Sequence, residues 1–276
     1  MKPLQIGVCS WSLRQPDLAT ALRVAKEQLG LDLMQVGFFD EAVLDASGDR
    51  AVVDAVRASG VEVSATCVGF VGEDYSSIDA IAQTGGYRPD DQFKARLAKT
   101  IRVRDLTVAL GAPMMTTHIG FVPEGGSGPA YATVVERLKR VCDALDEKDI
   151  ILTMETGQEP AEHLMQFIDD VNRPNIRVNF DPANMVLYGV GDPVEAVGIL
   201  GERIAHVHCK DAKFSDSPGK AWGQEVPLGQ GEANVSGVLS TLRQIGYTGP
   251  LVIEREGGED RIGDVRAGIS LLQSLL

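Results

Sequence analysis

The sequence predicts a closed (β/α)8 TIM barrel, an α/β fold with a parallel eight-stranded sheet inside and helices outside. Short runs rich in Val, Ile and Leu alternate with longer amphipathic stretches along the whole chain. This alternation implies parallel strands joined by right-handed helical crossovers. Eight such units in 276 residues match the usual size of this barrel, about 250 residues. We therefore expect residues 1–276 to form a single domain.

The individual elements follow from the apolar pattern and from the turn residues that bound it. Strands are predicted at residues 4–10, 31–37, 61–67, 113–118, 149–155, 176–181, 204–208 and 250–254. Helices are predicted at residues 18–29, 52–59, 90–110, 131–145, 161–171, 193–200, 235–245 and 262–276. Gly30, Gly60 and Gly111 directly follow three of these helices, as C-cap glycines commonly do.

An open, doubly wound sheet is the alternative architecture. Such a sheet would normally carry a glycine-rich dinucleotide turn after its first strand. The chain instead has Cys9-Ser10-Trp11-Ser12-Leu13 at that position. The closed barrel is therefore favoured.

Composition excludes several classes of protein. The chain is 44% hydrophobic and 24% charged, which is too apolar for a disordered protein. No run approaches the roughly 18 apolar residues that cross a bilayer, so no membrane partner is expected. The net charge of −13 argues against a nucleic-acid partner, which requires a basic face.

The compartment is predicted to be cytoplasmic. The first residues lack the long apolar region and cleavage site of a secretory signal. Cys9, Cys67, Cys142 and Cys209 are widely spaced and form no C-x-x-C pair. We expect buried free thiols, with a nucleophilic cysteine as the alternative that no local context supports.

Two connections are unusually long. Residues 68–89 follow the third strand and residues 212–233 follow the seventh, and both are rich in glycine. Both would lie at the C-terminal mouth of the barrel, where catalytic loops gather. Loops of this length are uncommon unless they have a function, so we interpret them as candidate lids, with a passive insertion as the alternative for the first.

Ionisable residues stand at the C-terminal ends of the last four strands, although a barrel interior is expected to be apolar. Adjacent parallel strands lie about 4.8 Å apart, so these ends can converge on one point. Three carboxylates placed together repel one another unless a cation offsets them. We therefore predict that one divalent metal is held by Glu155, Asp181, His208 and Glu254. The alternative is that each carboxylate caps a helix or pairs with a Lys or Arg.

The ligand set suits several metals, of which manganese is favoured and magnesium, cobalt and zinc are alternatives. His206 lies two residues before His208 and so on the same face of the strand, one layer deeper. It is a candidate substrate contact or a core histidine. Lys210 could hold a substrate oxyanion or pair with a neighbouring carboxylate.

With these residues, the chain resembles members of the sugar isomerase/epimerase superfamily, which have a xylose isomerase-like barrel. The superfamily includes ketose 3-epimerases and inosose dehydratases. The matching segments are Met154–Glu159, Asn179–Asn184, His206–Asp211, Leu228–Gly231 and Ile253–Glu254. The resemblance implies the same four metal ligands. It further implies that Glu155 and Glu254 are the catalytic acid and base on opposite faces of the sugar.

The chain departs from the epimerases in two places. They commonly carry a histidine where this chain has Asn184, and an amide cannot shuttle a proton near neutral pH. They also have a substrate-binding arginine near the position of Lys213 and Phe214. The superfamily's nucleases need extra histidines for three zinc ions, and His118 is the one counterpart here. We reject the nuclease function and interpret His118 as a candidate substrate contact, with a core histidine as the alternative.

The expected function is that of a metal-dependent sugar isomerase or epimerase, which transfers a proton next to a carbonyl through an enediolate. The alternatives are an inosose dehydratase-like lyase at the same site and a non-catalytic sugar-binding barrel. Gln158, Asn184 and Lys210 are expected to bind hydroxyls, and Trp11 could face the sugar ring or pack in the core. The partner is a small sugar or sugar-derived molecule, and the outer helix faces could support a homodimer.

Overall fold

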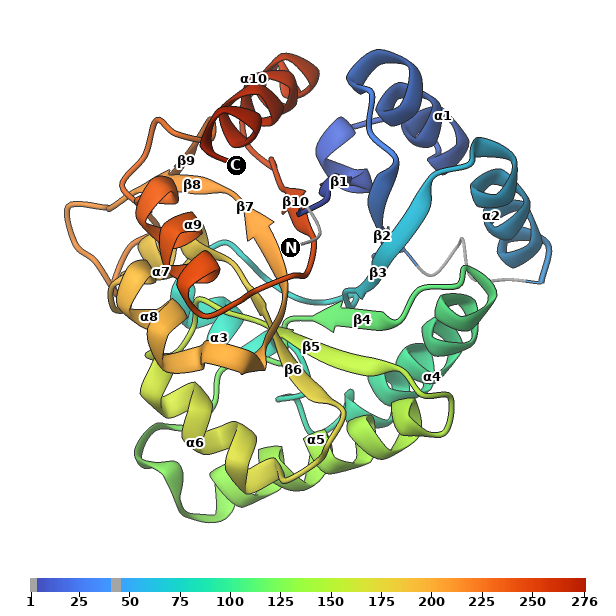
Figure 1. Cartoon of the computed structure of the whole chain (residues 1–276). Helices are drawn as coiled ribbons and strands as arrows, with labels where there is room; N and C mark the ends of the chain where they lie inside the picture. Colours follow the sequence, from blue (N-terminus) through green and yellow to red (C-terminus); the bar gives the residue numbers. More distant parts are fainter. Residues whose placement is uncertain (1–3, 41–45) are drawn as a thin grey trace.

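The computed structural model describes residues 4–40 and 46–276 and shows the predicted closed barrel (Figure 1). Its eight parallel strands are β1 (Ile6–Cys9), β2 (Leu33–Phe38), β3 (Glu62–Val68), β4 (Met114–Thr117), β5 (Ile151–Glu155), β6 (Ile176–Phe180), β7 (Ile204–Cys209) and β10 (Leu251–Ile253). The first and last strands pair directly, with Ile6 opposite Leu251 and Val8 opposite Ile253. This pairing closes the sheet and excludes the open alternative.

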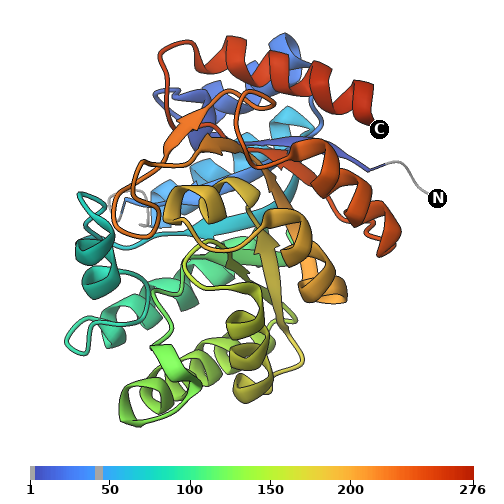
Figure 2. The ribbon, with the colours of Figure 1, turned by 90° about the vertical axis from the view of Figure 1, so that its left-hand side faces the viewer.

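Helices surround the barrel, as the sequence predicts (Figures 1 and 2). The outer helices are α1 (Leu18–Arg23), which continues as a π-helical turn (Val24–Gln28), α2 (Ala46–Ser59), α4 (Phe93–Ala109), α5 (Pro129–Asp146), α6 (Ala161–Val171), α8 (Pro193–Leu200), α9 (Val235–Gln244) and α10 (Arg261–Leu275). Their positions agree with the predicted helices, except that α2 begins six residues earlier than expected.

Two short helices were missed by the sequence analysis. Helix α3 (Ile78–Thr84) lies within the first long connection, and α7 (Pro182–Tyr188) directly follows β6. Each has only seven residues, too few to give a clear helical period. Both depend on tertiary packing, because Ile78 and Ile81 of α3 pack against Tyr188 of α7.

The second long connection contains a small antiparallel hairpin, β8 (Asp211–Lys213) with β9 (Gln224–Val226), which the sequence analysis also missed. Asp211 organises the turn that follows it. Its carboxylate accepts hydrogen bonds from the backbone amides of Gly229 (2.9 Å), Gly231 (2.8 Å) and Ala233 (3.1 Å). This carboxylate therefore explains why Asp211 and the Leu228–Gly231 turn occur together.

The barrel interior is less apolar than expected. Gln35, Thr116, Thr153, Asn179 and His206 are all fully buried inside it. Each has a hydrogen-bond partner, so burial leaves these groups satisfied. They form a polar layer directly beneath the strand ends that carry the candidate site.

Candidate metal centre

The structure brings the four predicted metal ligands together at the C-terminal mouth of the barrel. Glu155 ends β5, Asp181 follows β6, His208 lies in β7 and Glu254 follows β10. One potential ligand atom from each lies within 4.8 Å of all the others. His208 Nδ1 is 3.4 Å from Glu155 Oε1, 3.5 Å from Glu254 Oε2 and 3.7 Å from Asp181 Oδ2.

Two atoms of this cluster test whether the residues fit a cation. Asp181 Oδ2 and His208 Nδ1 are buried and have no hydrogen-bond partner among the described residues. Leaving a buried polar atom unsatisfied costs about 1–3 kcal/mol, and more for a charged group. Three carboxylates and one imidazole nitrogen aimed at one point are the donors expected for a divalent metal. The residues therefore fit a divalent metal.

Asp181 caps a helix with one carboxylate oxygen and leaves the other oxygen unpaired among the described residues. Its Oδ1 caps helix α7 by accepting from the backbone amides of Ala183 (2.8 Å) and Asn184 (3.0 Å). Its Oδ2 remains free and faces His208. The helix cap therefore orients the carboxylate towards the cluster.

The protonation of the cluster reflects burial and mutual charge. Burial raises the pKa of Asp181. Burial also acts against the charged form of His208, but Glu254 and the other nearby acidic groups outweigh it and hold the pKa of this imidazole well above its ordinary value. In the absence of metal, the cluster is therefore stabilised by a proton on His208.

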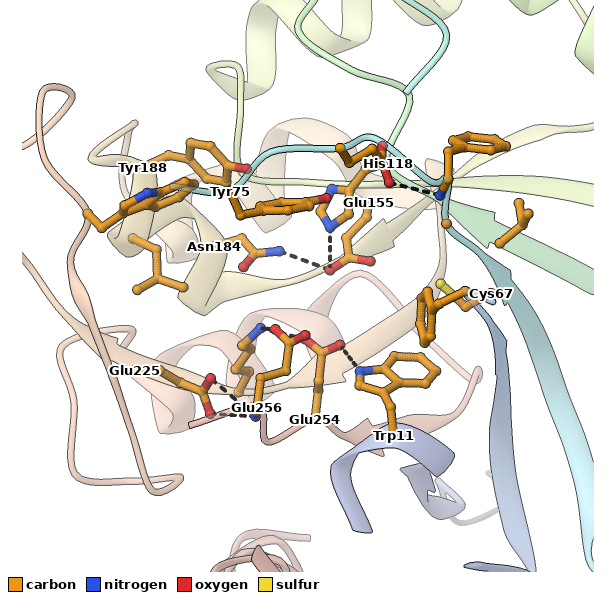
Figure 3. A pocket seen from close by; sticks show the side chains of 18 residues that line it. Trp11, Cys67, Tyr75, His118, Glu155, Asn184, Tyr188, Glu225, Glu254 and Glu256 are labelled. Atoms are coloured by element: carbon orange, nitrogen blue, oxygen red, sulfur yellow. Dashed lines mark hydrogen bonds and ion pairs between the residues drawn. The ribbon is translucent and has the colours of Figure 1, made fainter. Parts of the chain in front are cut away.

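The carboxylate of Glu155 is contacted by a neutral amide and by a titratable imidazole. Asn184 Nδ2 donates to Glu155 Oε1 over 2.9 Å, and His118 Nε2 lies 3.5 Å from the same oxygen (Figure 3). Burial raises the pKa of Glu155, but His118 and His208 outweigh it, so that the pKa is lowered overall.

Glu254 is held by a cation and an indole. Lys210 Nζ donates to Glu254 Oε2 over 2.7 Å and to Glu256 Oε2 over 2.6 Å. Trp11 Nε1 donates to Glu254 Oε1 over 2.8 Å (Figure 3). Burial raises the pKa of Glu254, but Lys210 and His208 reverse the effect and hold it well below its ordinary value.

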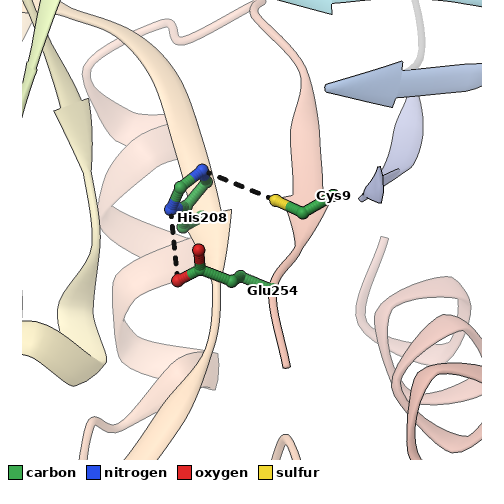
Figure 4. Close-up of side chains that lie close together, drawn as sticks. All are labelled: Cys9, His208 and Glu254. Carbon is green, nitrogen blue, oxygen red and sulfur yellow. Dashed lines mark hydrogen bonds and ion pairs between the residues drawn. The ribbon is translucent and has the colours of Figure 1, made fainter. Parts of the chain in front are cut away.

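Cys9 approaches His208 from the other side of the ring. Its Sγ lies 3.7 Å from Nε2, while Nδ1 faces Glu254 (Figure 4). Burial raises the pKa of the Cys9 thiol to about 12, so without a metal it stays protonated. Cys9, His208 and Glu254 also lie close enough together to form a second, smaller group of possible metal ligands. All four cysteines are buried free thiols, as predicted.

A cavity of about 610 Å³ opens above the cluster. Tyr75, Tyr188 and His118 lie on one side of it, and Trp11, Glu225 and Glu256 lie on the other (Figure 3). Both long connections contribute to its wall, the first through Tyr75 and the second through Trp222 and Glu225. Within the part of the chain that the structure describes, His118 Nδ1 and Trp222 Nε1 are buried without a hydrogen-bond partner.

The predicted substrate contacts are divided by the structure. His118, Asn184 and Lys210 line the cavity, whereas Gln158 and His206 do not. Gln158 Nε2 is buried against the hydroxyl of Tyr188, at 3.4 Å. His206 lies in the polar layer below, 3.0 Å from Ser64 Oγ and 2.7 Å from Asn179 Oδ1, and burial holds its pKa well below the ordinary value.

The sequence analysis missed several residues of the cavity wall. Tyr75 and Trp222 come from the two long connections, where no periodicity marks a side chain that lines a cavity, and Tyr188 comes from the helix α7 that was not predicted. Glu256 could have been found, because it stands two residues after Glu254 and so on the same side of an extended chain.

No helix in the described ranges is long and apolar enough to cross a bilayer.

The chain matches the family described as xylose isomerase-like TIM barrel over residues 22–275. It is 35% identical to a xylose isomerase domain protein from Planctomyces limnophilus, whose crystal structure superimposes with a TM-score of 0.88 over 100% of this chain and 98% of that one.

Among curated proteins, an uncharacterised protein of Methanocaldococcus jannaschii is 25% identical over 58% of this chain. An L-ribulose 3-epimerase of a Methylomonas species is 24% identical over 67% of this chain. The matches span 60% and 65% of the lengths of these two relatives. The family match covers nearly the whole barrel, and the chain is therefore a member of the xylose isomerase-like TIM barrel family.

Proposed function

We propose that this protein is a divalent-metal-dependent sugar isomerase or epimerase. The single observation that carries the proposal is the set of four converging ligand atoms, two of which are buried and otherwise unpaired. The similarity to an L-ribulose 3-epimerase supports a sugar substrate. Glu155, Asp181, His208 and Glu254 would hold the ion, with manganese as the favoured metal.

A divalent ion at this position supplies Lewis acidity towards a carbonyl and its neighbouring hydroxyl. The protein must then move a proton at the adjacent carbon. Glu155 and Glu254 are the carboxylates that border the cavity at the cluster, and each is within reach of a bound sugar. Both are ionised at neutral pH and can accept that proton, because each has a lowered pKa.

Other cavity residues are suited to bind the rest of the sugar. His118 and Trp222 line the cavity, and each has a ring nitrogen without a hydrogen-bond partner among the described residues, so we expect these side chains to contact substrate hydroxyls. The aromatic side of the cavity, with Tyr75 and Tyr188, offers apolar surface to the C–H face of a sugar ring. Lys210 already contacts two carboxylates, so it is poorly placed to attract a phosphate.

The test is proton exchange measured by NMR in D2O. Metal-free protein would be supplied with Mn²⁺ for the reaction, the metal removed before spectra are recorded, and a panel of free ketoses, sugar phosphates and inososes compared. We expect deuterium to enter a carbon next to the carbonyl of at least one sugar, with an isomer or epimer as product.

The variant Glu155→Gln should lower exchange by about 10²–10⁴-fold. The matched control is Glu159→Gln, since Glu159 is also a buried carboxyl near the end of β5 but bonds to the Val122 amide outside the cavity. Release of water with an unsaturated product would instead identify a lyase. Binding of a sugar without any exchange would identify a non-catalytic barrel and contradict the proposal.

A further inference from the structure

The polar layer inside the barrel contains a hydrogen-bonded chain that ends on His208. Gln35, in the middle of β2, is fully buried and reaches across the barrel. Its Oε1 lies 2.6 Å from His208 Nε2, and its Nε2 lies 2.9 Å from Thr116 Oγ1. The amide of Gln35 thus connects a candidate metal ligand to two other strands of the barrel.

The Thr153 end of this chain determines which group donates and which accepts in each hydrogen bond. Thr153 Oγ1 donates to the backbone carbonyl of Met115 over 3.3 Å, and a carbonyl can only accept. With its one hydrogen used there, Thr153 accepts from Thr116 Oγ1 over 2.8 Å. Thr116 in turn accepts from the Gln35 amide nitrogen, so the Gln35 carbonyl oxygen must face the imidazole.

We propose that Gln35 is a positioning residue that fixes the tautomer of His208, so that Nε2 carries the hydrogen and Nδ1 offers its lone pair to the metal. A carbonyl oxygen at 2.6 Å requires a hydrogen on the facing nitrogen. The only remaining lone pair of the neutral ring is then on Nδ1, which is the atom that faces the three carboxylates. This inference rests on the metal centre of the proposed function.

Two further groups lie near the same ring nitrogen. Cys9 Sγ donates to Gln35 Oε1 over 3.4 Å and so helps to hold this oxygen in place. Asn179 Nδ2 lies 3.2 Å from His208 Nε2, and as a donor it would favour the opposite tautomer. The Gln35 contact is 0.6 Å shorter, and its orientation is set independently by the threonines.

A tautomer fixed in advance matters for metal binding. A metal ligand whose second ring nitrogen is held by a hydrogen bond enters the site already oriented, and loss of such a partner typically weakens metal affinity 10–100-fold. Gln35 touches neither the cavity nor any carboxylate of the cluster in the contacts that the structure records for it. Its role is therefore exerted through His208.

The tautomer can be read directly by NMR of histidine side chains labelled with ¹⁵N, using Zn²⁺ as a diamagnetic probe. The chain has only four histidines, and the variant His208→Gln assigns the signal. We expect a hydrogen on Nε2 and zinc on Nδ1 of His208. Zinc on Nε2 with a hydrogen on Nδ1 would overturn the inference.

Zinc affinity provides the second measurement. Gln35→Leu should weaken binding about 10–100-fold, whereas Gln35→Glu, which keeps an acceptor facing His208, should remain close to the wild type. A purely structural role of Gln35 would not separate these two variants by metal affinity. Equal affinity of Gln35→Leu and the wild type would contradict the inference.

A milder pair of variants keeps the test informative if Gln35→Leu fails to fold. Thr116→Val removes the group that orients Gln35 and should weaken zinc binding, whereas Thr66→Val breaks a similar buried contact, to Thr107 at 2.7 Å, that does not lead to His208. Equal zinc affinity of the two variants would contradict the inference. Absence of zinc binding by the wild type would instead contradict the metal centre, and the tautomer would then be read from the metal-free protein at alkaline pH.

Discussion

The two glutamates of the cluster occupy equivalent positions at the ends of strands, yet their surroundings differ. Glu254 has both carboxylate oxygens engaged, one by the Lys210 ammonium and one by the Trp11 indole. Glu155 is contacted through one oxygen by a neutral amide and an imidazole. Burial raises the pKa of Glu254, but Lys210 and His208 together hold it well below its ordinary value. Burial also raises the pKa of Glu155, which is lowered overall by His118 and His208.

If the cluster holds a metal and moves a proton as proposed, the two glutamates are expected to contribute unequally to these two roles. A carboxylate that is clamped by a buried ammonium group is a stable metal ligand but gives up its charge reluctantly. A carboxylate with a free oxygen and titratable neighbours can accept and return a proton more easily. We therefore expect Glu155 to carry more of the proton transfer and Glu254 more of the metal binding.

The largest effect should come from exchanging the two carboxylates for amides. At saturating Mn²⁺, Glu155→Gln should lower deuterium exchange by about 10²–10⁴-fold. Glu254→Gln should lower exchange less than this and weaken Mn²⁺ binding more than Glu155→Gln does, as measured by calorimetry. Equal losses of deuterium exchange in the two variants at saturating Mn²⁺ would show that Glu155 and Glu254 contribute equally to the proton transfer.

Removal of the Lys210–Glu254 ion pair should destabilise the metal-free protein. Lys210 and Glu254 are both buried, and breaking a buried ion pair by removing one partner costs about 3–5 kcal/mol. Lys210→Met should therefore lower the free energy of unfolding in urea by about this amount.

The control for the loss of the Lys210–Glu254 ion pair is Glu256→Gln. The Glu256 side chain is 55% exposed, so its ion pair with Lys210 should contribute less than about 1 kcal/mol to the free energy of unfolding. Similar unfolding curves for Lys210→Met and Glu256→Gln would mean that the buried Lys210–Glu254 ion pair does not stabilise the metal-free protein.

The cluster should also give the metal-free and metal-loaded proteins opposite responses to pH. The pKa of His208 in the folded state is raised above its ordinary value of 6.5, so the folded protein binds more protons than the unfolded chain in this range. The stabilisation from this proton is fully present below about pH 6.5 and is lost as the pH rises through the folded pKa.

Metal must displace the same proton, so metal affinity should rise with pH over that range. The increase in Tm on adding Mn²⁺ should therefore be larger at pH 8 than at pH 6, as measured by thermal unfolding, while the Tm of the metal-free protein changes in the opposite sense. An increase in Tm that is independent of pH would show that His208 carries no proton in the metal-free cluster.

The smallest expected effect concerns the aromatic wall next to Asn184 and Glu155. The ring of Trp222 packs against Tyr188 with centroids 4.7 Å apart, and its Nε1 is unpaired. Trp222→Phe keeps an aromatic ring and removes the donor, which should weaken sugar binding by about 1 kcal/mol, or roughly fivefold. NMR titration of the sugar measures this, and an unchanged affinity would mean that the Trp222 N–H does not contact substrate.

Much of the site could be predicted from the sequence because it depends on strand ends. Glu155, Asp181, His208 and Glu254 each stand at the end of a recognisable apolar run, and parallel strands bring such ends together. His206 was placed one layer below His208 by the two-residue period of a strand. The structure has it there, bonded to Ser64 and Asn179.

Other parts of the site could not be predicted, because they depend on contacts between distant segments. Tyr75 and Trp222 reach the cavity from the two long connections, where Tyr75 precedes α3 and Trp222 lies between β8 and β9, and these segments have no period of their own. The Lys210–Glu254 pair joins residues 44 positions apart, and the sequence left two roles open for Lys210.

The alternation of apolar strands and amphipathic helices was enough to predict the barrel. The ionisable residues at the strand ends predicted the four residues that converge at its mouth, and the motifs around them predicted the family. Burial and hydrophobic periodicity are properties of a single segment, so they can be recognised along the chain. Only the tertiary structure decided which oxygen of each carboxylate is free, which glutamate is clamped by Lys210, and that Gln35 faces His208. Those features depend on hydrogen-bond geometry across the barrel, where a difference of a few tenths of an ångström separates a bonded group from an unpaired one.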